Sequence, residues 1–189
     1  MKKNFKMAVI SLSFLIIGSM LMACGTKKVE EKTSAEVSTE DDWHDITISG
    51  YTFNIPDELI FTDSDDNGIG FIKNGNFDDA MLTINVQSYN DEYSNVNKDV
   101  LKKATLELWG ENCEEKEFEY YEESNYKGCY SWIDAKIGKD VCNNLTCIYV
   151  DRTNIIMITY IMDEKTDKEI KIENELLKQI GNKFVKLNY

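Results

Sequence analysis

Between residues 116 and 162 the chain carries four strand-like segments in a row, joined only by short polar connections. They read KEFEYY, CYSWIDAKI, LTCIYV and NIIMITYIM, and they are rich in the β-branched and aromatic residues that strands favour. Parallel strands need long crossover connections, whereas antiparallel strands can follow one another through tight turns. The stretch therefore predicts an antiparallel sheet as the centre of the fold.

More strands and two helices are predicted around this sheet. HDITISGYTFNIP alternates apolar and polar residues on both sides of Gly50, and IGFIK and AMLTINVQSY read as further strands with NGNFDD as the turn between them. Two segments instead have helical periodicity: Val100, Leu101, Ala104 and Leu108, ended by Gly110, and Lys168 to Leu187, where Leu176, Leu177, Ile180 and Phe184 share a face. Two amphipathic helices must cover the sheet, so the sequence predicts one α+β domain.

The order of these segments resembles the PsbP-like fold. The resemblance rests on the opening GYTFNIPDELI, the mid-chain helix, the strand meander and the closing NIIMITYIMDEKTDKEIKIENELLKQIGNKFVKL, and it spans roughly Trp43 to Leu187. It implies an antiparallel sheet covered by two helices. Members of that group serve mostly as binding or assembly modules and share no common catalytic residues, so the resemblance implies a binding role and transfers no site residue.

The N-terminus has the layout of an export signal. Lys2, Lys3 and Lys6 precede an uncharged apolar run from Met7 to Ala23, which is short and Ser/Gly-broken for a membrane span. The run ends in LMAC, which resembles the lipobox of bacterial lipoprotein signal peptides. That resemblance implies that Cys24 receives a diacylglycerol on its sulfur and becomes the new N-terminus. Two or three acyl chains such as palmitate then anchor the protein durably to a membrane, since each buried CH₂ contributes about 0.8 kcal/mol.

The sequence thus divides into a signal peptide at 1–23, a flexible acidic tether at 24–42 and one α+β domain at 43–189. The tether, GTKKVEEKTSAEVSTEDD after Cys24, has too few large apolar residues to form a core. The whole chain carries a net charge of −13, and loss of the leader with its three lysines leaves −16. Such a surface repels nucleic acid and anionic lipid headgroups, so the lipid has to hold the protein at the membrane. The lysine-rich composition, with Arg152 as the single arginine, is consistent with an AT-rich, Gram-positive source.

No catalytic, cofactor-binding or metal-binding residue is predicted with a specific motif. The single histidine, His44, stands at the edge of the tether, where it is poorly placed to serve a nucleophile. Asp63, Asp65, Asn67 and Gly68 match the first half of a calcium-binding loop, but Asn74 stands where a bidentate glutamate is needed. The segment is therefore interpreted as a turn between strands, with calcium binding as the alternative.

The segment EFEYYEESNYKGCYSWID is rich in aromatic residues. A hairpin turn centred near Asn125 predicts that Phe118 faces Trp132 and that Tyr120 faces Tyr130. This face is expected to pack under a helix. The alternative is an exposed platform that binds a peptide or a sugar.

The last four cysteines can form disulfides outside the cytoplasm, and they allow three connectivities. The predicted pairs are Cys113 with Cys142 and Cys129 with Cys147. They follow from the register above, which places Cys113 near the loop that carries Cys142, and from a three-residue turn at 137–139, which places Cys129 opposite Cys147. Free buried thiols are the alternative, because free cysteine packs well in cores.

The sequence therefore predicts a lipid-anchored lipoprotein on the extracytoplasmic face of the cell membrane. Its acidic domain is expected to act as a binding or assembly module for a protein or cell-envelope partner, without nucleic acid and without a cofactor. A small hydrolase or transferase acting on the cell envelope is the alternative function. A calcium-responsive surface protein is a third.

Overall fold

The computed structural model describes residues 43–65, 67–75, 80–89, 92–137, 140–163 and 165–189. Cys24, the apolar leader and the tether lie outside the described residues, so lipidation and the division at 23 and 42 stay predictions. No helix in the described part of the chain is long and apolar enough to cross a membrane.

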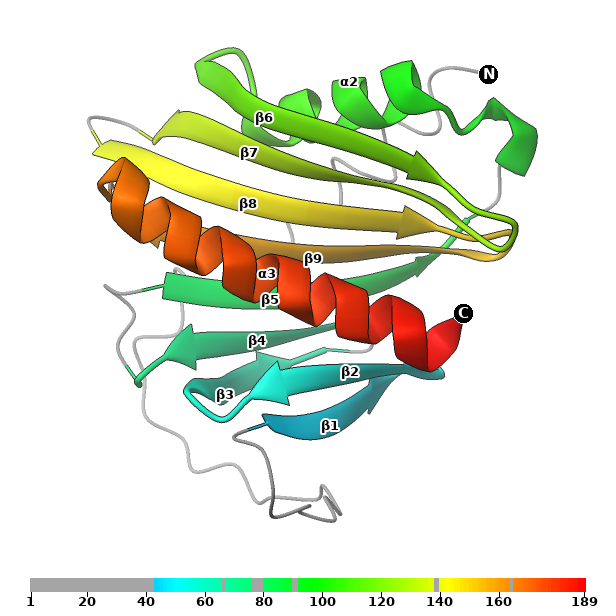
Figure 1. Ribbon diagram of the computed structural model, residues 1–189, viewed down its shortest axis with the longest axis horizontal. Helices are drawn as coiled ribbons and strands as arrows, with labels where there is room; N and C mark the ends of the chain where they lie inside the picture. Colours follow the sequence, from blue (N-terminus) through cyan, green and yellow to red (C-terminus); the bar gives the residue numbers. More distant parts are fainter. Residues whose placement is uncertain (1–42, 66, 76–79, 90–91, 138–139, 164) are drawn as a thin grey trace.

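The core of the fold is a seven-stranded antiparallel sheet with the strand order β3-β4-β5-β9-β8-β7-β6 (Figure 1). Its strands are β3 (Leu59–Ser64), β4 (Gly68–Lys73), β5 (Ala80–Ser88), β6 (Cys113–Glu122), β7 (Lys127–Ile137), β8 (Asp140–Val150) and β9 (Asn154–Asp163). A separate antiparallel pair is formed by β1 (Trp43–Ile48) and β2 (Tyr51–Pro56). Ser49 and Gly50 turn this pair with positive φ angles of 50° and 85°.

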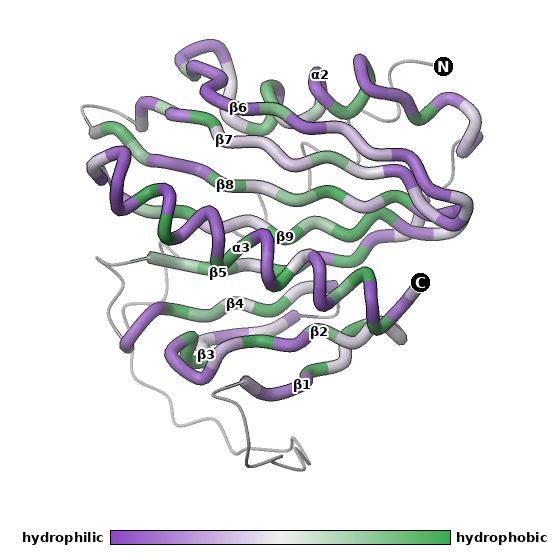
Figure 2. The backbone as a smooth tube through the Cα atoms, in the orientation of Figure 1, coloured by the Kyte–Doolittle hydropathy of each residue, from purple (hydrophilic) through white to green (hydrophobic). Residues whose placement is uncertain are grey.

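Helix α3 (Asp167–Asn188) covers one face of the sheet (Figure 1). It begins with a capping box, in which the Thr166 side chain and the Glu169 side chain each bond the other residue's backbone N–H. Hydrophobic and hydrophilic residues alternate along its turns (Figure 2). Its buried residues include Ile170, Leu177 and Phe184, which join the larger hydrophobic cluster with Ile156 and Ile158 of β9.

Helix α2 (Lys98–Trp109) covers the opposite face at the β6–β7 end of the sheet. The Asn97 side chain caps it by accepting a hydrogen bond from the Val100 N–H at 3.1 Å. A second hydrophobic cluster under this helix contains Leu101, together with Ile155 and Met157 of β9. Because Ile155 and Met157 alternate with Ile156 and Ile158, the two clusters lie on opposite faces.

The α+β class, the antiparallel sheet and both covering helices are confirmed. Two predicted hairpin registers are wrong, each by one residue, and the strand β3 is an element that the sequence did not predict. Phe118 pairs with Ser131 and Tyr120 with Cys129, because the loop at 123–126 contains an even number of residues. Likewise Tyr130 pairs with Cys147 across β7 and β8.

Candidate functional site

The strand β3 forms one edge of the seven-stranded sheet and exposes two large apolar side chains. Ile60 and Phe61 are each 50% exposed, whereas the preceding Leu59 is buried in the larger cluster. Alternation places Ile60 on the opposite face from Leu59 and Phe61. The Phe61 ring contacts the buried Phe71 ring edge-on, with centroids 6.4 Å apart. We define Leu59–Thr62 as the β3 edge.

The β3 edge also presents unpaired main-chain groups. The Asn74 N–H donates to the Glu58 carbonyl at 2.8 Å, so residues 58 and 74 form a hydrogen-bonded pair. In an antiparallel ladder such pairs alternate with non-bonded ones. Ile60, opposite Ile72, therefore bonds to β4, while Leu59 and Phe61 direct their N–H and C=O groups away from the sheet. Among the described residues no backbone group outside the sheet bonds to these two residues.

The opposite edge of the sheet, β6, is protected in the way that natural edge strands usually are. Charged residues occupy much of its length, and Figure 2 shows it as largely hydrophilic. Lysines of both helices bridge to it: Lys102 of α2 lies 2.6 Å from Glu115, and Lys178 of α3 lies 3.3 Å from both Glu117 and Glu119. The β3 edge has no charged residue between Leu59 and Thr62, so it is the more open of the two edges.

Carboxylates flank the β3 edge on both sides. Asp57 and Glu58 precede it, and Asp63 and Asp65 follow it, all four being exposed. Glu58 lies 3.5 Å from Lys73, which also pairs with Glu173 at 2.7 Å, and Asp57 lies 2.8 Å from His44. Asp63 and Asp65 form no ion pair with any residue in the described part of the chain. The exposed side chains of Ile60 and Phe61 are therefore flanked by carboxylates on both sides.

The calcium-like segment forms the turn between β3 and β4, as the turn interpretation predicts. The Asp65 N–H donates to the Gly68 carbonyl at 2.9 Å, and the Asn67 N–H donates to Asp65 Oδ1 at 2.8 Å. Asp63 lies within β3 and accepts from the Ser64 N–H at 2.8 Å. Within the described ranges, no group of three or more His, Cys, Asp or Glu residues could hold a metal ion.

His44 lies two residues after the end of the predicted tether, which is outside the described residues. It belongs to β1, where it pairs with Ile55 and its Nδ1 contacts Asp57 Oδ1 at 2.8 Å. This contact places His44 beside Asp57, one of the two carboxylates that precede the β3 edge.

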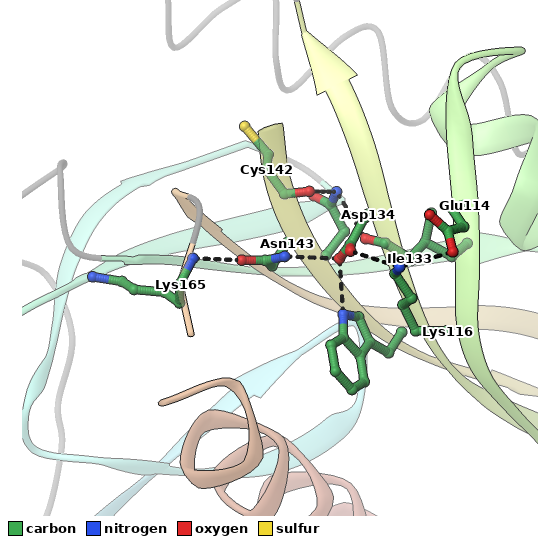
Figure 3. Close-up of polar contacts among 9 residues, drawn as sticks. Glu114, Lys116, Ile133, Asp134, Cys142, Asn143 and Lys165 are labelled. Atoms are coloured by element: carbon green, nitrogen blue, oxygen red, sulfur yellow. Dashed lines mark hydrogen bonds and ion pairs between the residues drawn. The ribbon is translucent and has the colours of Figure 1, made fainter. Parts of the chain in front are cut away.

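A polar network ties the start of α3 to the end of the sheet (Figure 3). Asp134 Oδ1 accepts hydrogen bonds from Trp132 Nε1 at 3.0 Å and from Asn143 Nδ2 at 2.7 Å. Asn143 Oδ1 accepts from the Lys165 N–H at 2.8 Å, and Lys116 Nζ lies 3.5 Å from Asp134 Oδ2. Both Asp134 oxygens are thus engaged with side chains of the protein, and Asn143 links them to the Lys165 main chain just before α3.

The aromatic hairpin is packed, as its first interpretation predicts. Tyr130 and Tyr126 are buried, and Tyr121 packs against the larger cluster under α3. Phe118 and Tyr120 pack against the second cluster, on the face covered by α2. The aromatic residues of this hairpin are therefore divided between two packed faces and do not form one flat exposed platform.

At the end of this aromatic cluster, Asp151 joins three distant parts of the chain. Its Oδ1 accepts from the N–H groups of Thr153 and Asn154, both at 2.7 Å, and its Oδ2 accepts from the hydroxyls of Tyr51 and Tyr189. Burial by itself raises the pKa of the Asp151 carboxyl, but the hydrogen bonds from Tyr51, Thr153 and Asn154 outweigh it and lower the pKa.

We expect the domain to lose stability in acid, because protonation of Asp151 removes the stabilising effect of its ionised carboxylate. A carboxyl whose folded pKa is lowered stabilises the fold above its unfolded pKa of about 3.9, and this contribution is lost as the pH falls through the folded pKa. Asp151→Asn should therefore lower the free energy of unfolding at pH 7, and the gap to wild type should shrink at pH 3. Urea unfolding at both pH values measures this. A gap of equal size at both pH values would contradict the assignment.

The observed register is unfavourable for both predicted disulfides. Cys129 lies in the second cluster and Cys147 in the first, so their side chains point to opposite faces. Cys113 and Cys142 both pair with Ala135 from either side, which puts their Cα atoms about 10 Å apart, beyond the usual span of a disulfide. Burial raises the pKa of Cys147 to about 12, and it also raises that of Cys129. The pairing stays a prediction that the observed register does not favour.

Comparison with known proteins shows the fold. Neither a family model nor a curated protein sequence matches the chain. The solved structure of the Ran-binding protein Mog1p from Saccharomyces cerevisiae matches with a TM-score of 0.55 and 8% identity over 78% of this chain and 95% of that one. CyanoP, the cyanobacterial PsbP from Synechocystis sp. PCC 6803, matches with a TM-score of 0.53 and 14% identity over 86% of this chain and 96% of that one. The predicted PsbP-like fold is thereby confirmed.

Proposed function

We propose that this chain is a lipoprotein that is anchored through Cys24 on the extracytoplasmic face of the cell membrane and whose folded domain binds a protein partner. The observation that carries the binding role is the β3 edge. It combines two half-exposed apolar side chains with outward main-chain groups on a segment, Leu59–Thr62, that carries no charge. Edges of this kind associate readily with other chains unless they are blocked.

Two further observations support the proposal. The same fold occurs in Mog1p, whose structure is described as that of a Ran-binding protein, so the fold is compatible with a protein-binding role. The anchor is supported by the sequence LMACG after an apolar leader. A net charge of −13 gives the protein surface no attraction to anionic lipid, which leaves acylation as the means of attachment.

Replacing Cys24 by alanine tests the anchor. Full-length wild-type protein should incorporate a fatty-acid probe and sediment with membranes, whereas Cys24→Ala should carry no label and remain as unprocessed precursor. Cys113→Ala is the matched control, because it removes another partly exposed thiol and should leave labelling unchanged. If Cys24→Ala still matures and still takes up the probe, the anchor lies elsewhere.

A further inference from the structure

We propose that the β3 edge binds an extended segment of the partner as an additional antiparallel or parallel strand, and that this segment has an apolar centre flanked by lysine or arginine. The proposal rests on the protein-binding role above and names the class of partner. Strand addition is a common mode of peptide recognition, in which main-chain hydrogen bonds supply affinity and neighbouring side chains supply specificity.

The main chain sets the length of the segment. Leu59 and Phe61 offer two N–H donors and two C=O acceptors to an incoming strand. The register shift between Phe61 and Asp63 then interrupts the regular ladder. A segment of about three to five paired residues therefore fits the edge, since strand pairing uses every second residue for hydrogen bonding.

The side chains favour apolar residues at the centre of that segment. Ile60 and Phe61 project to opposite faces, so residues of the incoming strand on either face find an exposed apolar neighbour. Cross-strand pairs with such residues stabilise the pairing of strands. Phe61 is backed by Phe71, which holds its ring in place from within the sheet.

Charge favours basic residues at the ends of the segment. Asp57 and Glu58 lie at one end of the edge, and Asp63 and Asp65 lie at the other. Lysine or arginine side chains that flank an apolar centre therefore meet carboxylates at both ends. Exposed pairs of this kind are weakened by salt, so binding should fall as ionic strength rises.

The same charges disfavour a second copy of this chain. In an antiparallel pairing of two β3 edges centred on Ile60, Leu59 of one copy would bond to Phe61 of the other, and Asp57 of one copy would lie near Asp63 of the other. Like charges directly opposite each other destabilise strand pairing, and each copy carries a net charge of −13. The occupant is therefore a basic segment of another protein.

A designed peptide tests the proposal on the full-length chain in detergent. The probe is a fluorescent nine-residue peptide with two lysines, the core Val-Thr-Val-Thr-Val, and two more lysines. Two control peptides carry glutamates in place of the lysines, or methyl groups on the core amide nitrogens. We expect the probe to bind, and we expect both controls to bind at least about tenfold more weakly, because each control removes several hydrogen bonds or several ion pairs at once.

Two variants of Phe61 separate the main chain from the side chain. Phe61→Ala removes the ring and keeps the outward N–H, whereas Phe61→Pro removes the N–H as well. Because this N–H does not bond to β4, proline should leave the β3–β4 ladder intact. We expect Phe61→Pro to bind the probe about tenfold more weakly than Phe61→Ala. The double variant Asp63→Asn and Asp65→Asn keeps the side-chain oxygens that accept hydrogen bonds in the turn but removes two negative charges. It should therefore bind the probe more weakly, and its binding should depend less on salt.

Equal binding of the methylated peptide, or equal binding by Phe61→Ala and Phe61→Pro, would overturn strand addition. A dimer of the chain in analytical ultracentrifugation that Phe61→Pro abolishes would assign the edge to a second copy instead. If the probe fails to bind but a photo-reactive residue at position 60 still crosslinks to a partner in cells, the proposed binding role stands and only strand addition is wrong. If neither is seen, both are wrong.

Discussion

Replacing Phe184 by alanine is expected to lower the free energy of unfolding by about 3–5 kcal/mol. Phe184 is fully buried where α3 meets the sheet and the β1–β2 pair. Its ring stacks on Phe53 at 4.8 Å between centroids and contacts Tyr149 at 5.0 Å. Since a domain of this kind is stable by about 5–15 kcal/mol, the variant should unfold at a much lower urea concentration.

Leu187→Ala is the matched control in the same helix. Leu187 is half-exposed near the end of α3, so its removal should cost within about 0.5 kcal/mol, as surface substitutions usually do. Urea unfolding followed by far-UV circular dichroism compares the two variants. A cost for Phe184→Ala close to that for Leu187→Ala would show that α3 does not pack on the sheet as described.

Adding a single methyl group at Gly128 is expected to cost about 2–3 kcal/mol, within the range for overpacked cores. Gly128 lies in β7 between Tyr121 of β6 and Tyr149 of β8. A Cβ atom there would collide with the Tyr121 ring and would stand 2.6 Å from the carbonyl oxygen of Ile148. The backbone oxygen cannot move without disturbing the β7–β8 ladder.

A second background separates the ring contact from the backbone contact. In a Tyr121→Leu protein the ring is gone, so Gly128→Ala should cost less than in wild type, while the collision with Ile148 remains. The difference between the two costs measures the coupling between the two positions. If thermal and urea unfolding give the same cost in both backgrounds, the Tyr121 ring does not pack against Gly128.

Much of the fold follows from the sequence because its strands and helices are long and strongly patterned. The β-branched run NIIMITYIM indicates a strand, and the spacing of Leu177, Ile180 and Phe184 indicates a helix, so the type of each element is clear from the sequence. The hairpin registers were harder, because one residue more or less in a turn moves every side chain to the other face. The predicted pairing of Cys129 with Cys147 rests on such a register, and it stays a prediction that the observed register does not favour.

The β3 edge could not be found from the sequence in the same way. Leu59, Ile60 and Phe61 form a run of only three apolar residues between Asp57 and Asp63, which is too short to show a period of two. Its role as a strand depends on β4, which it pairs with, and its exposure depends on the order of strands in the sheet. The one available signal was an apolar triplet inside an acidic segment.

Site-specific photo-crosslinking in cells tests whether the membrane-anchored domain binds its partner through the β3 edge. A photo-reactive amino acid replaces Ile60 on the β3 edge or Ile172 on α3, which is 61% exposed and serves as the matched apolar control. We expect a discrete crosslinked product from position 60 that is absent from position 172 and is lost when Cys24 is also replaced by alanine. Mass spectrometry of that product should map the partner's attachment point to an extended segment with flanking basic residues. Crosslinks that arise equally from both positions, or from position 172 alone, would contradict a membrane-anchored module that binds its partner through the β3 edge.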